Sequence, residues 1–144
     1  MPALGSHCVL ELYDCPAAVL DDVETVLAAL RVATDDAGAT LLQLAHHRFA
    51  PQGLTALALL SESHISVHTW PERGYAACDV FTCGRQTRPE AACMALVEAL
   101  QCARYVLRRF PRGQALPPAA QSVSVAATED REDPSPSSPR ARPA

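Results

Sequence analysis

The stretch LSESHISVHTWPERGYAACDVFTCG, residues 60–84, decides the fold. Apolar and polar residues alternate through its two halves, 64–70 and 75–83. Successive side chains of a strand point to opposite faces, so this pattern predicts two strands, each with one apolar face and one face rich in reactive groups. The apolar faces comprise Ile65 and Val67 in the first strand and Ala76, Cys78 and Val80 in the second. The opposite faces comprise His64, Ser66 and His68 in the first strand and Asp79, Phe81 and Cys83 in the second.

The segments on either side of this stretch extend the sheet and add helices. Further strands are predicted at residues 7–13, 39–49, 54–61 and 103–110. Apolar residues recur at helical spacing between Pro16 and Gly38, and again from Pro89 to about Cys102. This order of elements predicts an α+β fold, a two-layer α/β sandwich whose mainly antiparallel sheet carries helices on one face.

The composition divides the chain into one domain, residues 1–110, and a tail, residues 111–144. The tail holds seven of the twelve prolines, no aromatic residue, four arginines and four acidic residues. Such a segment buries too little apolar surface to offset its ordering entropy, so we expect it to be disordered.

Charge and cysteine content narrow the classes of function. The net charge of −4, with no basic cluster in the first 100 residues, argues against nucleic-acid binding. No apolar run has the length of a membrane span and no signal peptide is evident, which predicts a cytoplasmic protein. The six cysteines show no metal-binding spacing, and we expect Cys8, Cys93 and Cys102 to be small buried hydrophobic residues without disulfides.

Ser63 follows Glu62 at the start of the first predicted strand and permits an unusual reaction. Its hydroxyl can attack the Glu62 carbonyl and convert the amide into an ester. A base can then remove the Ser63 α-proton, and elimination and hydrolysis leave a pyruvoyl group at a new chain start. His68 suits the role of base because imidazole titrates near neutrality. An ordinary strand-end hydroxyl is the alternative, and the spacing alone does not decide between them.

Other chemistries are less well supported by the residues. His64 and His68, with His46 or His47 nearby, leave open a metal site, although we expect none. A hydrolase nucleophile elbow, G-x-S-x-G, and phosphate-binding glycine loops are missing. Cys83 can serve as a proton donor, because a thiol is mostly protonated at pH 7.

Residues 62–84, ESHISVHTWPERGYAACDVFTCG, closely resemble the processing segment of prokaryotic S-adenosylmethionine decarboxylase proenzymes, the short pyruvoyl-dependent class. The resemblance extends from about His7 through the HHRF motif at 46–49 to about Phe110. It implies cleavage between Glu62 and Ser63, which gives a β chain of residues 1–62 and an α chain of residues 63–144. The pyruvoyl group made from Ser63 would form a Schiff base with the amine of S-adenosylmethionine, and CO₂ loss would give the aminopropyl donor for spermidine.

The resemblance also implies roles for other residues. His68 would be the proton acceptor in processing, and Cys83 the proton donor in catalysis. The substrate-binding residues would be Phe49 and Trp70 for adenine and Glu72 for ribose. Thr55 stands where family members carry a serine that assists processing, and Arg73 stands where an uncharged or aromatic residue is common. Family members pair, so a homodimer of αβ units with active sites at its interface is expected.

All twelve basic residues are arginine, so the chain has no lysine. Pyridoxal phosphate is commonly held through a lysine imine, and that chemistry is therefore excluded. Two alternatives remain: a pyruvoyl-dependent arginine or ornithine decarboxylase on the same fold, and a non-catalytic relative that acts as a binding module. The aromatic pair Phe49 and Trp70 speaks against the first, and the intact Ser63, His68 and Cys83 against the second.

Overall fold

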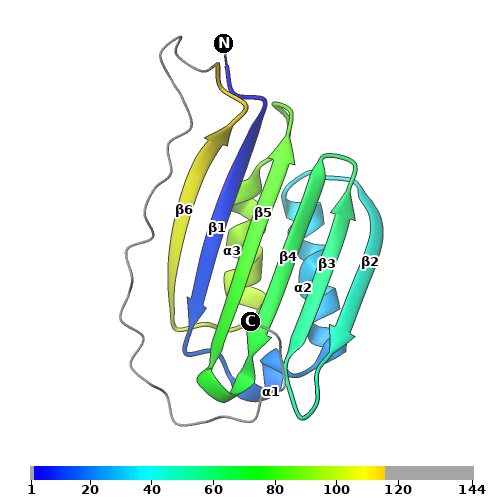
Figure 1. Cartoon of the computed structure of the whole chain (residues 1–144), viewed down its shortest axis with the longest axis vertical. Coiled ribbons are helices and arrows are strands. Elements are labelled where there is room, and N and C mark those ends of the chain that lie inside the picture. Colours follow the sequence, from blue (N-terminus) through cyan, green and yellow to red (C-terminus); the bar gives the residue numbers. More distant parts are fainter. Residues whose placement is uncertain (1, 116–144) are drawn as a thin grey trace.

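A computed structural model of the chain describes residues 2–115. Within them, six strands form one sheet in the order β2-β3-β4-β5-β1-β6, and every neighbouring pair is antiparallel (Figure 1). The strands are β1 (Gly5–Tyr13), β2 (Leu41–Arg48), β3 (Leu54–Leu60), β4 (Ser63–Trp70), β5 (Tyr75–Cys83) and β6 (Arg104–Arg112). The helices are α1 (Ala17–Leu20), α2 (Val23–Asp36) and α3 (Pro89–Ala99), and η1 (Pro71–Arg73) is a 3-10 turn. The helices α2 and α3 cover one face of the sheet, which confirms the predicted two-layer α+β sandwich.

The two strands of the deciding stretch, β4 and β5, lie in the middle of the sheet. They are joined through η1, which ends at Gly74 with a φ of 60°. A Cβ at Gly74 would lie 3.1 Å from the carbonyl oxygen of Cys15, so both the backbone angle and the space favour glycine. The tight connection fixes the β4–β5 register, in which Ser63 lies opposite Thr82.

The first helical segment consists of two helices, where the sequence pattern predicted one. Asp22 interrupts it, because the Asp22 carboxylate accepts a hydrogen bond of 3.1 Å from the Thr25 backbone N–H and so caps α2. The second helical segment begins at Pro89 as predicted but ends at Ala99, three residues before Cys102.

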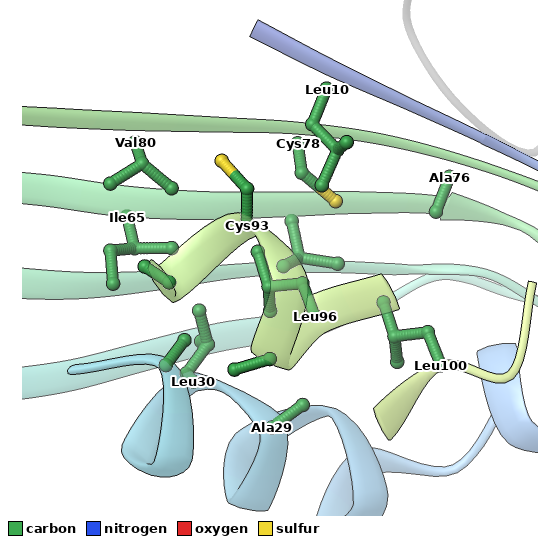
Figure 2. Close-up of a cluster of buried hydrophobic side chains, with 14 of the residues drawn as sticks. Leu10, Ala29, Leu30, Ile65, Ala76, Cys78, Val80, Cys93, Leu96 and Leu100 are labelled. Atoms are coloured by element: carbon green, nitrogen blue, oxygen red, sulfur yellow. The ribbon is translucent and has the colours of Figure 1, made fainter. Parts of the chain in front are cut away.

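The core lies between the sheet and the two long helices (Figure 2). The residues Leu10, Ile65 and Val80 enter it from the sheet, and all three are fully buried. Leu30 from α2 and Leu96 from α3 meet them and are also fully buried. Burial of a side chain of this size contributes about 1.5–3 kcal/mol, so this face supplies most of the hydrophobic stabilisation.

The cysteines of this layer behave as apolar side chains. Cys8 and Cys93 are fully buried, as predicted, and Cys102 is partly buried. Burial raises the pKa of Cys15 to about 12 and raises the pKa of Cys78, so these thiols stay neutral near pH 7.

The strand β6 continues to Arg112, two residues past the predicted end of the domain at residue 110. The rest of the predicted disordered tail, from residue 116 onward, lies outside the described residues. Within residues 2–115, no helix is long and apolar enough to cross a membrane.

Candidate active site

The face of the sheet opposite α2 and α3 carries the reactive side chains. An open groove of about 590 Å³ runs over β3 and β4 on this face. Its polar lining consists of Thr55, Ser63, His64, Ser66, His68 and Asp79, and its apolar lining of Ala56, Leu57, Leu59 and Leu60. The histidines of β4 therefore share one strand face, as the alternation predicted.

Ser63 begins β4 with a backbone φ of 143°, a region that residues other than glycine rarely adopt. Its hydroxyl oxygen lies 3.2 Å from Nδ1 of His64. Backbone strain therefore sits at the bond that the sequence predicts to be cut, and an imidazole nitrogen sits beside the predicted nucleophile.

The Glu62 residue before Ser63 is held by two hydrogen bonds. Its carbonyl oxygen accepts one from the Cys83 backbone N–H at 2.9 Å, and its carboxylate accepts one from the Thr40 backbone N–H at 3.0 Å. A backbone N–H on a carbonyl oxygen stabilises the negative charge that develops there when a nucleophile attacks the carbonyl carbon. The chain thus positions and polarises the carbonyl next to Ser63.

Cys83, the predicted proton donor, lies at the end of β5 and is exposed. It lines a separate depression together with Glu62, Gly84 and neighbouring residues. A Cβ at Gly5 would lie 3.4 Å from the Cys83 sulfur and 2.8 Å from the Phe81 ring, so glycine on β1 leaves room beside the thiol. Cys83 is therefore close to the Glu62–Ser63 bond, although it is not part of the larger groove.

His68 lies toward the other end of β4. It faces Thr55 on β3, and the Thr55 hydroxyl lies 3.1 Å from His68 Nδ1, so the structure brings these two predicted processing residues together. Five residues of extended strand at about 3.3 Å each separate the Cα atoms of Ser63 and His68 by roughly 16 Å. Within one chain, the structure does not bring His68 to Ser63.

The predicted substrate-binding residues lie at the His68 end of the sheet. Trp70 ends β4 and packs against Tyr75, with ring centroids 5.4 Å apart. Phe49 follows β2 and packs against His47 with a centroid distance of 4.7 Å, and Glu72 is exposed in η1. The predicted site residues thus form two groups, one at each end of β4.

Two residues outside the predicted site, His7 and Asp79, complete it. Nε2 of His7 and Nε2 of His64 lie 2.7 Å and 2.8 Å from the same oxygen, Asp79 Oδ2, and the Ser66 hydroxyl donates to the other oxygen. Burial alone would raise the pKa of the Asp79 carboxyl, but the hydrogen bonds from Ser66, His64 and His7 lower it. Asp79 is therefore a carboxylate at neutral pH.

The three ligand-type atoms of His7, His64 and Asp79 lie within 4.8 Å of one another. We assign them to hydrogen bonds, because each Nε2 is within hydrogen-bond distance of the carboxylate. The sequence left open a metal site at His64 and His68 with His46 or His47. Among residues 2–115, the grouping found is instead His7, His64 and Asp79. The predicted lack of a metal stays a prediction.

Comparisons with known proteins give one consistent result. A family model described as S-adenosylmethionine decarboxylase matches residues 6–113. The chain is 58% identical over 109 residues to the S-adenosylmethionine decarboxylase proenzyme of Parasynechococcus marenigrum strain WH8102, covering 76% of this chain and 85% of the relative. It is 47% identical over 113 residues to the proenzyme of the same description from Methanococcus aeolicus, covering 78% and 97%. The crystal structure of the adenosylmethionine decarboxylase from Aquifex aeolicus VF5 superposes with a TM-score of 0.75 at 34% identity, covering 84% of this chain and all of that one.

Proposed function

The chain belongs to the S-adenosylmethionine decarboxylase family, and we propose that it is a proenzyme that cuts itself between Glu62 and Ser63 and then removes CO₂ from S-adenosylmethionine. The observation that carries the proposal is the geometry at the bond to be cut. Ser63 has a φ of 143°, and the Cys83 backbone N–H donates to the Glu62 carbonyl oxygen at 2.9 Å. Strain and carbonyl polarisation at one peptide bond both favour attack by the serine hydroxyl.

The surroundings of Ser63 fit a pyruvoyl group made from that residue. A break before Ser63 falls between a turn and β4, so the ladders of β4 with β3 and β5 hold the new chain start in place. The new end of the β chain, residues 1–62, is held because the Ser61 backbone N–H donates to the Thr40 carbonyl at 3.0 Å. The β chain stays attached to the α chain through the pairing of β3 with β4 and of β1 with β5. A pyruvoyl carbonyl supplies an electron sink for decarboxylation, and it needs no lysine.

The other site residues would then act on the substrate. Cys83 lies beside the new chain start and would hold the proton that replaces CO₂ on the substrate's α-carbon. Phe49 and Trp70 would stack on the adenine and Glu72 would bind the ribose. Arg73 follows Glu72 directly and is exposed, so it would add positive charge near a cationic substrate.

We propose that the enzyme is a homodimer of αβ units whose two active sites lie at the interface. His68 and Thr55 are roughly 16 Å from Ser63 along an extended strand, so a second copy is needed to bring one group to the other. The open face offers a surface for this pairing, since it exposes apolar side chains in the groove and on β6. They include Leu57, Leu59, Val106 and Phe110, each at least 38% exposed.

The product would serve as the aminopropyl donor for spermidine synthesis, and we expect the enzyme to act in the cytoplasm. The alternative substrates, arginine and ornithine, are less well supported because they need no adenine platform such as Phe49 and Trp70. The two relatives described above are also both S-adenosylmethionine decarboxylase proenzymes by description.

Intact mass spectrometry and CO₂ release test the proposal. The purified protein should give two fragments whose boundary is at Ser63, and the α chain should have the mass expected for a pyruvoyl start. CO₂ should be released from S-adenosylmethionine but not from arginine or ornithine. A single uncut chain of 144 residues would remove self-processing, and CO₂ release from only arginine or ornithine would establish the alternative.

A further inference from the structure

The hydrogen-bond partners of His7 on the open face show which of its ring nitrogens carries the hydrogen. Arg112 on β6 lies 2.8 Å from His7 Nδ1 through its Nη1. A guanidinium group can only donate, so His7 Nδ1 is the acceptor and, in the neutral ring, its hydrogen is on Nε2. That hydrogen points to Asp79 Oδ2 at 2.7 Å.

The same reasoning continues through Asp79 to His64. The carboxylate can only accept, so the His64 Nε2 atom 2.8 Å away must be a donor. In a neutral imidazole with its hydrogen on Nε2, Nδ1 carries a lone pair. The Ser63 hydroxyl lies 3.2 Å from this Nδ1, so the hydroxyl donates and His64 accepts.

We propose that His64 is the catalytic base of the first processing step, the conversion of the Glu62–Ser63 amide into an ester. This inference rests on the self-processing proposed above. His64 Nδ1 takes the hydroxyl proton as Ser63 Oγ forms a bond to the Glu62 carbonyl carbon. The bond from that carbon to the Ser63 nitrogen then breaks, and the nitrogen receives the proton from His64. The step gains and loses no atom and changes no oxidation state.

Asp79 and His7 are positioning residues in this step. Asp79 holds the tautomer of His64 that leaves Nδ1 free, and it stabilises the imidazolium that forms when the proton is transferred. His7 is held by Arg112 and donates a second hydrogen bond to the same Asp79 oxygen, Oδ2. The side chains of His7, His64 and Asp79 are 20%, 33% and 25% exposed, so solvent competes little for these hydrogen bonds.

This assignment gives the two histidines of β4 different steps of processing. His64 contacts the Ser63 hydroxyl, which must lose its proton first. His68 contacts Thr55 at the far end of the groove. In the proposed dimer, His68 of one copy would later remove the α-proton of Ser63 in the other copy. The two histidines therefore act on different protons, and their variants should stop processing at different intermediates.

Four variants of the full chain test this assignment: His64→Ala, His64→Gln, His68→Ala and His46→Ala. His46 is an exposed β2 histidine outside the network, so His46→Ala is the matched control. Cleavage is followed by mass spectrometry with and without hydroxylamine, which cuts an ester but leaves an amide intact. Circular dichroism establishes that each variant is folded. Gln can still donate to Asp79 and accept from Ser63, but it cannot take up a proton.

We expect His64→Ala and His64→Gln to slow cleavage about 100-fold or more and to stay uncut in hydroxylamine, because no ester forms. His68→Ala should be uncut alone and cut by hydroxylamine, and His46→Ala should match the unmodified chain. Ester accumulation in either His64 variant, or normal cleavage of His64→Gln, would overturn the assignment of His64. An unmodified chain that stays uncut would instead remove the proposed function itself, so the two failures are distinguishable.

Discussion

The two faces of the sheet are built from the same strands but by different rules. On the covered face, Ile65 and Val80 need only be apolar and of suitable size, because they contribute through burial and close packing with any apolar neighbour. On the open face, His64 and Asp79 are useful only if specific atoms meet within hydrogen-bond distance. The first face stabilises the fold, and the second carries the residues proposed for the chemistry, so changes on the two faces should have separable effects.

The largest effect on turnover is expected for Cys83→Ala. The Cys83 backbone N–H, which polarises the Glu62 carbonyl, remains in this variant, so the chain should still cut itself at least partly. Without the thiol, CO₂ release from S-adenosylmethionine should fall about 100-fold or more. Cys102→Ala, at a partly buried thiol outside the site, is the matched control and should keep normal turnover. Unchanged turnover in Cys83→Ala would show that the proton comes from another group.

A smaller but clearer contrast comes from one substitution made on each face. Leu96→Ala empties a fully buried position and should lower the free energy of unfolding by about 2–5 kcal/mol. Leu57→Ala, at a side chain that is 38% exposed, should lower it by less than about 1 kcal/mol. Urea denaturation of the two variants measures the difference in their free energies of unfolding. Both are made in a Ser63→Ala chain, which lacks the serine hydroxyl and should stay uncut.

The same pair tests the role of the open face in pairing. Sedimentation velocity should show weaker dimers for Leu57→Ala and unchanged dimers for folded Leu96→Ala. Equal effects of the two changes on both measurements would mean that the two faces do not have separate roles.

The difference between the faces also explains what could be predicted from the sequence. Alternation is a local property, so the inward position of Ile65 and the outward position of His64 could be read from neighbouring residues. The contact between His7 and Asp79 depends on the register of β1 with β5, across 72 residues of chain. No local sequence pattern predicts that register. A single histidine at the start of a strand, such as His7, does not by itself indicate a site residue.

The same limit applies to the two halves of the site. Side-chain chemistry and the motif resemblance both selected Ser63 and His68, but neither measures distance. The extended backbone of β4 separates them by roughly 16 Å. Likewise, the split of the first helical segment depends on the Asp22 side chain, which competes for the Thr25 backbone N–H and so overrides the continuous apolar pattern.

The last effect is expected for Asp79→Asn, which tests whether a charge on the open face also stabilises the fold. The lowered pKa of the Asp79 carboxyl in the folded chain means that its ionised form stabilises the fold. That contribution is fully present above the unfolded value of about 3.9 and is lost as the pH falls through the lower folded value. The amide side chain of the variant cannot ionise, so the Asp79→Asn chain should lack this contribution at every pH.

Urea denaturation of Ser63→Ala and of Ser63→Ala with Asp79→Asn, from pH 3 to pH 7, measures this contribution. The single variant should be more stable by about 1–2 kcal/mol near pH 6, the size of a few hydrogen bonds to a partly exposed charged group. The gap should narrow below about pH 4, because protonation of Asp79 then removes the charge that the substitution removed. A gap that stays constant to pH 3 would mean that Asp79 stabilises the open face by packing, and that its charge serves only to hold His64 for the reaction.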